Sequence, residues 1–269
     1  MDIVIAGPGR AGLSLAHRLQ HTDHRLAGLV GRDPQATAVA AAALGCPALG
    51  WDDRLPACDL LVIAVRDDAI AGAADRLAPR AGSVRAAVHL SGLVPVTALA
   101  PLGMPCGSFH PLQTMPDPET GARLLDGAWV AVTSGDGSLA DRLDSLARSL
   151  GMHPFAIGDD AKPPYHAAAA AAANFPLAAL SIAERLFAAS GVPFEAAGPL
   201  VRAVVANAFD LGPRAALTGP IARGDAGTVA AQITAASACD PELGEAFRAM
   251  ARATAAVAGT AGELGEVLG

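Results

Sequence analysis

Apolar runs with the length of β-strands alternate with helical patterns through the first half of the chain. The apolar runs lie at 2–6, 25–30, 59–65, 84–90, 106–109, 129–132 and 153–157. Helical patterns cover 11–19, 34–44, the segment from Asp68 to about Leu77, and about 138–150. The run at 59–65 is apolar throughout after Asp59, which is typical of a parallel strand covered on both faces. This alternation predicts an α/β fold built on a doubly wound parallel sheet.

The pattern changes near residue 159. From Pro164 onward the sequence shows only helical patterns, with breaks at the glycines and prolines of 191–193, 198–199, 212–213 and 219–220. The first of these helices could run to Ser190, about 40 Å at 1.5 Å per residue, with a kink at Pro176. The sequence therefore predicts two domains, a sheet domain at 1–158 and an all-helical domain at 159–269.

Composition argues against several classes of protein. Hydrophobic residues make up 52% of the 269 residues, but no uninterrupted apolar run reaches the roughly 20 residues that a membrane span needs. Met1 leads straight into the first strand, so no signal peptide is expected. A net charge of −7 argues against a nucleic-acid partner. The four cysteines are widely spaced and form no C-x-x-C pair, so we expect a cytoplasmic protein with neither a metal site nor disulfides.

The first strand is followed by a glycine-rich motif. Residues 7–12 read GPGRAG, a G-x-G-x-x-G pattern made by Gly7, Pro8, Gly9, Arg10, Ala11 and Gly12. Between a strand and a helix, the first glycine permits a tight turn, the second lets the backbone approach a pyrophosphate, and the third allows close helix packing. The free N–H groups at the helix start would bind phosphate oxygens. The motif predicts a Rossmann dinucleotide-binding domain at 1–158, and the alternative is a glycine-rich turn without a ligand.

The end of the second strand bears on the choice of cofactor. An acidic residue about 20 positions beyond the glycines usually holds the ribose 2′-hydroxyl of NAD. Here the strand ends in Gly31 and Arg32, and a guanidinium suits the 2′-phosphate of NADP. Asp33 could take a ribose hydroxyl or cap the helix that Pro34 opens. We therefore expect NADP (NADPH), with NAD the less favoured cofactor. Arg10 either faces the phosphates or is simply exposed.

Six motifs together resemble a known family: GPGRAG (7–12), VRDDAI (65–70), HLSG (89–92), GSFHPLQT (107–114), YHAAA with NF (165–175) and ALTGPIARGD (216–225). The chain is similar to Rossmann-like oxidoreductases whose C-terminal half is domain of unknown function 2520. Their layout is that of ketopantoate reductase and pyrroline-5-carboxylate reductase, in the 6-phosphogluconate-dehydrogenase-like group. The resemblance implies an NAD(P)-dependent reductase that forms a homodimer through its helical domain. Val65 and Arg66 would lie beside the cofactor, although the family usually has proline at the position of Arg66.

The resemblance also suggests catalytic residues. When Asn174, Phe175 and Pro176 are laid on the Asn-Pro region of ketopantoate reductases, the position of their lysine falls on His166. The eight-residue separation of His166 and Asn174 lets both side chains face one cleft. His166 would donate a proton, since an imidazole populates both protonation states near neutral pH, and Asn174 would hold a substrate oxygen. Structural roles in capping and packing are the alternatives for both, and Lys162 is the rival proton donor.

Further candidates come from the other motifs. Ser91 follows a strand at its carboxyl end, where ligands bind in open α/β sheets, and could contact the substrate or the cofactor ribose. The remaining candidates for substrate binding are His110, Gln113, Thr218 and Arg223. Arg223 suits a carboxylate because its planar fork matches two oxygens, and a solvated or interface role is its alternative. His89, within an apolar strand, is expected to be a core residue, and Asp225 is expected to cap a helix.

These expectations define three hypotheses about function. The first is an NADPH-dependent reductase that converts a small 2-keto acid into a 2-hydroxy acid, with ketopantoate as the best single substrate. The second is an imine reductase of the pyrroline-5-carboxylate type, which would need no general acid because an iminium is already protonated. The third is a non-catalytic protein that binds NADP as a sensor or as a partner subunit.

Overall fold

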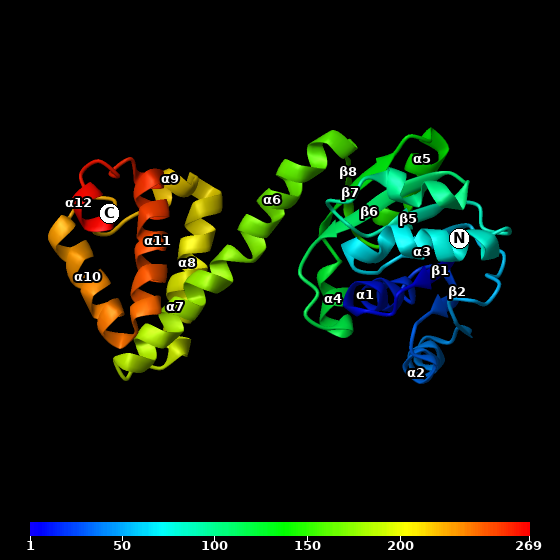
Figure 1. Ribbon diagram of the computed structural model, residues 1–269, viewed down its shortest axis with the longest axis horizontal. Coiled ribbons are helices and arrows are strands. Elements are labelled where there is room, and N and C mark those ends of the chain that lie inside the picture. Colours follow the sequence, from blue (N-terminus) through cyan, green and yellow to red (C-terminus); the bar gives the residue numbers. More distant parts are fainter. The chain divides into compact units, whose positions relative to one another are not determined.

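The computed structural model describes residues 1–269, which form two compact units, Met1–Ala170 and Ala171–Gly269. The first unit contains an eight-stranded sheet (Figure 1). Its strands are β1 (Asp2–Ala6), β2 (Arg25–Val30), β3 (Ala48–Leu49), β4 (Leu60–Ile63), β5 (Ala87–His89), β6 (Cys106–Leu112), β7 (Trp129–Ser134) and β8 (His153–Ala156). All the apolar runs predicted as strands are strands in the structure.

The strand order is β3-β2-β1-β4-β5-β6-β7-β8. Every neighbouring pair is parallel except β6 and β7, which are antiparallel. The first six strands have the order of a Rossmann sheet, in which the chain reverses direction between β1 and β4. The predicted doubly wound sheet is therefore confirmed, with one antiparallel pair added beyond β6.

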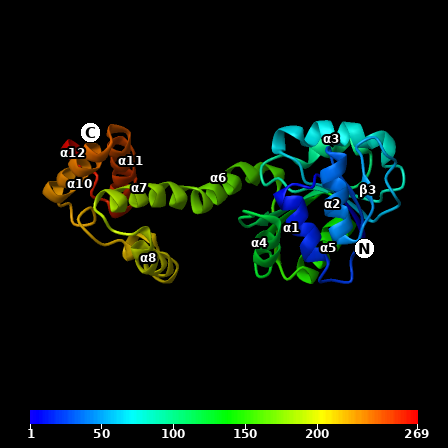
Figure 2. The same ribbon diagram turned by 90° about the horizontal axis from the view of Figure 1, so that it is seen from below.

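Two helical layers cover the sheet (Figure 2). The helices of this unit are α1 (Arg10–Leu19), α2 (Pro34–Leu44), α3 (Ile70–Leu77), α4 (Pro118–Leu124) and α5 (Gly137–Ser149). Side chains of α1, α2 and α5 share one buried cluster with strand residues such as Ile5 and Val62. Side chains of α3 share a second cluster with the alternate strand residues, such as Val4 and Ile63. Because successive strand side chains point to opposite faces, each strand contributes side chains to the packing against both helical layers.

Two local predictions are corrected. The strand expected at 106–109 is longer than predicted, because His110, Pro111 and Leu112 pair with β7 and extend β6 to Leu112. The helix α4 was not expected at all. Asp117 caps it by accepting the backbone N–H of Thr120, and Pro118 occupies its first position.

The predicted long helix is two helices, α6 (Lys162–Ala173) and α7 (Phe175–Ala189). They are separated at Asn174, and Pro176 lies in the first turn of α7, in line with the predicted kink. The compact units meet at residues 170 and 171 rather than at the predicted 158. The reason is that the start of α6 is bonded to the sheet unit through the buried side chain of Lys162.

One helical stretch meets the length and composition of a membrane span, although no apolar run in the sequence led us to expect one. Residues Asp159–Ala189 form 31 residues of helix that are long and apolar enough, by length and composition alone, to cross a bilayer, and none of the most apolar window is buried. A charged side chain near each end of the stretch forms an ion pair. Lys162 is held by the sheet unit, and Arg185 pairs with Asp240.

The second unit is entirely helical, as predicted. After α7 it contains α8 (Ala197–Leu211), α9 (Pro213–Ala216), α10 (Ala226–Cys239), α11 (Pro241–Ala258) and α12 (Gly265–Leu268). The predicted break at 198–199 is absent, because Pro199 lies in the first turn of α8, where its missing N–H costs nothing. The core of this unit lies among α10, α11 and α12 and includes Val229, Ile233 and Ala255.

Candidate active site

The glycine motif forms the turn from β1 into α1. Gly7 has a φ of +106° and donates its N–H to the carbonyl of Val30, 2.9 Å away. A Cβ on Gly12 would lie 2.2 Å from the carbonyl oxygen of Gly7, so only glycine permits this close packing. A Cβ on Gly9 would meet nothing within 4 Å. No side chain caps the first turn of α1. The turn therefore offers free N–H groups beside open space, which fits a pyrophosphate.

Arg32 and Asp33 have different environments at the end of β2. The Asp33 carboxylate caps α2 by accepting the N–H groups of Gln35 and Ala36, at 2.9 and 3.0 Å. Arg32 is exposed and forms no ion pair or side-chain hydrogen bond. Asp33 therefore has the capping role that the sequence left open, and the guanidinium remains available for a 2′-phosphate.

The residues after β4 lie against the glycine turn. A Cβ on Gly7 would lie 2.5 Å from the carbonyl oxygen of Ala64 and 3.0 Å from a methyl group of Val65. Arg66 points into solvent and pairs with Asp68, 2.7 Å away. Val65 therefore lines the turn, whereas Arg66 has a local partner. Arg10 is exposed and unpaired.

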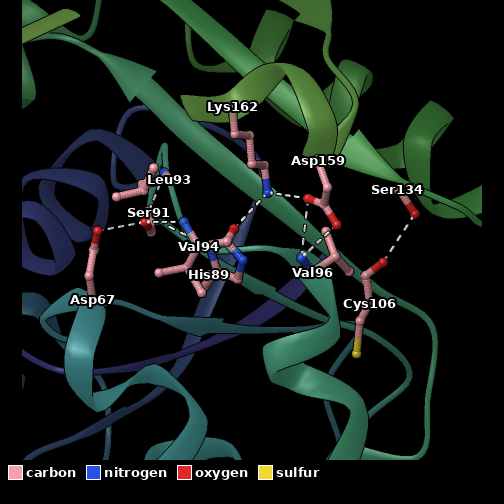
Figure 3. A network of polar contacts seen from close by, with 10 residues as sticks. All are labelled: Asp67, His89, Ser91, Leu93, Val94, Val96, Cys106, Ser134, Asp159 and Lys162. Carbon is pink, nitrogen blue, oxygen red and sulfur yellow. Dashed lines mark hydrogen bonds and ion pairs between the residues drawn. The ribbon is translucent and has the colours of Figure 1, made fainter. Parts of the chain in front are cut away.

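A polar network ties the loop after β5 to the loop after β4 (Figure 3). The buried Ser91 hydroxyl donates to the Asp67 carboxylate at 2.8 Å and accepts the N–H groups of Leu93 and Val94. His89 is fully buried, as predicted, and its Nδ1 accepts the N–H of Ser91. Burial lowers the pKa of His89 to about 4. All hydrogen-bonding positions of the Ser91 hydroxyl are thus used to hold the loop.

Lys162 is buried in the same network, with 1% of its surface exposed. Its Nζ donates to the carbonyl of Val94 and pairs with the carboxylate of Asp159, each 2.8 Å away. The Asp159 carboxylate also accepts the N–H of Val96 (Figure 3). Both groups bonded to Nζ belong to the chain itself, so Lys162 is better placed to anchor α6 than to donate a proton to a substrate.

His110, Tyr165 and His166 come together where β6 meets α6. The Nδ1 atom of His110 lies 2.7 Å from the Tyr165 hydroxyl, and the two imidazole centroids are 5.9 Å apart. The Nδ1 atom of His166 is buried without a hydrogen-bond partner. Burial is the main cause that lowers the pKa of His110 to about 4, and burial raises that of Tyr165 to about 12. The predicted candidates His110 and His166 are therefore neighbours.

Tyr165 is a site residue to which the sequence assigned no role. It is the single tyrosine of the chain and precedes His166 directly, but nothing in the sequence indicated which residue it contacts. Its contact with His110 spans 55 positions in the sequence. Only pairing of β6 in the sheet and docking of α6 on the same unit bring the two rings together.

The other candidates lie elsewhere. Gln113 uses its amide to hold the chain, because Nε2 donates to the carbonyl of Leu124 and Oε1 accepts the N–H of Thr114. Asn174, Thr218 and Arg223 belong to the helical unit, where all three are exposed. Asp225 caps α10, as predicted, by accepting the N–H and hydroxyl of Thr228. The roles of Asn174, Thr218 and Arg223 in binding stay predictions.

No group of three or more His, Cys, Asp or Glu side chains in the chain is arranged to hold a metal ion. All four cysteines are free thiols.

Comparisons with known proteins agree with this architecture. Residues 128–254 match the family described as domain of unknown function 2520. Protein BF3122 of Bacteroides fragilis, provisionally described as an NADP oxidoreductase, is similar over 95% of this chain and 98% of its own, with 20% identity and a TM-score of 0.83. Protein TM1727 of Thermotoga maritima is similar over 96% and 98%, with 21% identity and a TM-score of 0.70.

A third solved structure is 1-pyrroline-5-carboxylate reductase of Streptococcus pyogenes, similar over 92% of this chain and 98% of its own, with 19% identity and a TM-score of 0.61. No curated protein matches the sequence. At these identities the structural likeness establishes the fold, and the family match covers the second half. The chain has a Rossmann fold, and its residues 128–254 match the family described as domain of unknown function 2520.

Proposed function

We propose that this protein is an NADPH-dependent oxidoreductase that reduces a small 2-keto acid to a 2-hydroxy acid, with ketopantoate the first substrate to test. The observation that carries the proposal is the cluster of His110, Tyr165 and His166 beside Gly92, on the sheet edge that also bears the glycine turn. A carbonyl needs both a hydride and a proton to become an alcohol, and this cluster supplies groups that donate hydrogen bonds and protons. The structural relative that is provisionally described as an NADP oxidoreductase supports the same class of reaction.

The cofactor assignment rests on two features. The uncapped start of α1 faces open space at Gly9, where phosphate oxygens would accept the free N–H groups. Arg32 is free to bind a 2′-phosphate because Asp33 is committed to capping α2. When bound, the reduced nicotinamide would supply the hydride.

His166 is the proposed proton donor. The imidazolium transfers a proton to the carbonyl oxygen as the carbon gains a hydride, and the neutral imidazole then regains a proton from water. Lys162, the rival donor, is sequestered by Val94 and Asp159. Asn174, Thr218 and Arg223 remain the proposed contributors from the helical unit, with Arg223 suited to a substrate carboxylate.

Two other functions would fit parts of the same site. An imine reductase is favoured by the relative that reduces 1-pyrroline-5-carboxylate, and in such an enzyme His166 would be dispensable. A non-catalytic NADP-binding protein is compatible with the glycine turn and Arg32 alone.

The test is NADPH oxidation measured with a panel of 2-keto acids, cyclic imines and a blank without substrate. Turnover of ketopantoate or another 2-keto acid, with kcat reduced at least about 100-fold in His166→Ala, is the expected result, since general acids typically contribute this much. Turnover of imines alone would replace the proposal with the second function. Tight NADPH binding without any turnover would replace it with the third.

We further propose a homodimer formed through the helical unit. Its helices α7 and α8 expose large apolar side chains: Phe175, Leu177, Leu200, Val204, Val205, Phe209 and Leu211. An apolar surface of this extent is typical of a protein or membrane interface. A second copy fits better than a bilayer, because α7 carries Glu184 and an Arg185 that pairs with Asp240.

A further inference from the structure

His110 lies just past the carboxyl end of β5. The parallel register pairs His89, the last residue of β5, with Ser108 of β6. His110 is two residues further along β6, beyond the end of β5. A Cβ on Gly92 would lie 2.7 Å from the His110 ring, so the glycine lets the loop after β5 pass directly against the imidazole. This is the sheet edge where ligands of open α/β sheets bind.

Burial, with a smaller contribution from nearby charges, lowers the pKa of His110 and keeps its ring neutral. Burial is the largest influence on its pKa, and the nearby His166 and Lys162 on α6 also disfavour the charged form. Asp67, in the loop after β4, acts in the opposite direction but does not prevail. A neutral imidazole has one nitrogen that donates and one that accepts, so its function depends on which nitrogen carries the hydrogen.

The contact with the Tyr165 hydroxyl indicates which nitrogen of His110 carries the hydrogen. Burial raises its pKa, so the hydroxyl keeps its hydrogen at neutral pH. His110 Nδ1 is its only hydrogen-bond partner in the chain. If Nδ1 donated, the hydroxyl would have no acceptor within the chain, whereas a hydroxyl that donates to Nδ1 leaves no donor unsatisfied at this contact. This contact therefore favours the tautomer of His110 with its hydrogen on Nε2, an atom for which the structure gives no hydrogen-bond partner in the chain.

We propose that Tyr165 is a positioning residue that holds His110 in its Nε2–H tautomer, and that this N–H donates a hydrogen bond to the oxygen of the carbonyl being reduced. The inference rests on the proposed function and adds a residue pair to it. Negative charge develops on that atom as the adjacent carbon gains a hydride, and a fixed neutral donor stabilises this charge. His110 gives up no proton in the step, because His166 supplies it.

The first arm of the test reads the tautomer directly. Nitrogen-15 NMR of His110 in the free protein is expected to show an unprotonated Nδ1 and a protonated Nε2. In Tyr165→Phe, which keeps the ring and removes only the hydroxyl, the two nitrogens are expected to average toward a mixture of tautomers. A protonated Nδ1 in the wild type, or no change in Tyr165→Phe, would overturn the proposal.

The second arm reads contact with a ligand without requiring turnover. Oxamate, an unreactive amide analogue of a 2-keto acid, added with NADP is expected to shift the His110 Nε2–H resonance. With a reducible substrate, kcat is expected to fall about 100-fold in His110→Leu, because one donor to a developing oxyanion contributes about this much. It should fall less in His110→Gln, which retains an N–H donor, and about tenfold in Tyr165→Phe with little change in the KM for NADPH.

The two arms separate this inference from the proposed function. A response to oxamate without turnover of any carbonyl or imine would contradict the function and leave the His110 donor in place. Normal turnover in His110→Leu, or an Nε2–H resonance unaffected by oxamate, would overturn the inference and leave the function standing.

Discussion

Asp33 and Arg32 are neighbours in the sequence but have different tasks at the end of β2. The carboxylate lies within hydrogen-bond distance of the first N–H groups of α2, which have no partner within the helix. The guanidinium has no acceptor in the chain. A charged side chain left without a partner beside a dinucleotide turn is where recognition of a 2′-phosphate would occur.

Replacing Arg32 with alanine tests this assignment. The KM for NADPH is expected to rise about tenfold to 100-fold, because a hydrogen bond to a charged group contributes about 1.5–3 kcal/mol. The KM for NADH should change little, and Arg54→Ala, which removes another exposed and unpaired arginine, should leave both constants as they are. Initial rates with each cofactor measure the effect, and an unchanged NADPH preference would remove Arg32 from the site.

Lys162 shows how burial decides the task of a titratable side chain. Its surroundings consist of one carbonyl and one carboxylate that also holds the backbone of Val96. We expect Lys162→Met to lower the free energy of unfolding by about 2–3 kcal/mol, because a mostly buried pair loses one partner. The exposed pair of Arg185 and Asp240 provides the control, and Arg185→Met should cost no more than about 1 kcal/mol.

Urea unfolding of both variants measures these free energies. The turnover of folded Lys162→Met should stay within a few-fold of the wild type. A large loss of kcat with unchanged stability would instead identify Lys162 as the proton donor.

At the scale of elements, the turn between β1 and α1 contains one glycine that is needed for packing and another that is proposed to be needed for cofactor binding. Gly12 is required by the packing of α1 against the turn, whereas Gly9 faces open space. A pair of alanine substitutions, Gly9→Ala and Gly12→Ala, therefore distinguishes the two requirements with the same chemical change.

Gly9→Ala is expected to keep the thermal midpoint within a few degrees and to weaken NADPH binding at least about tenfold, because the new methyl group occupies the space where the pyrophosphate approaches. Gly12→Ala is expected to lose both stability and binding, since its Cβ would lie 2.2 Å from a carbonyl oxygen. Calorimetry gives binding and circular dichroism gives stability. Normal NADPH affinity in Gly9→Ala would place the pyrophosphate away from this turn.

At the scale of the whole molecule, the second unit leaves apolar surface that its own helices do not cover. Its core gathers around α10, α11 and α12, while α7 has no buried residue and α8 has only Ala197. Phe209 on α8 is 88% exposed. Leaving so much apolar area in water is costly, at about 25 cal/mol for each Å².

The proposed homodimer accordingly predicts a molecule of twice the chain mass in light scattering. Phe209→Glu should shift the protein toward monomer, because a charge would be buried in the interface without a partner. The control is Val39→Glu, at a valine that is 68% exposed on α2 of the other unit and should leave the dimer intact. A monomeric wild type that binds lipid vesicles would contradict the homodimer and assign the apolar stretch to a membrane.

Local patterns in the sequence were enough to predict every strand except β3, most helices, the glycine turn and the cap at Asp225, because each depends on neighbours a few positions away. They offered a cap at Asp33 as one of two alternatives. The helix α4 carried a readable start in Asp117 and Pro118, but it was too short for its periodicity to register. The extension of β6 past Pro111 could not be foreseen, since it depends on pairing with β7.

The site depended on contacts between distant positions. The sequence and its family resemblance supplied His166 and Lys162 as candidate proton donors and His110 as a candidate for substrate binding. Tertiary structure alone decided that Lys162 is buried against Val94, 68 positions away, and that Tyr165 is bonded to His110, 55 positions away. Protonation and hydrogen bonding depend on the atoms that surround a group, and folding brings these atoms from strands and helices that local patterns cannot relate.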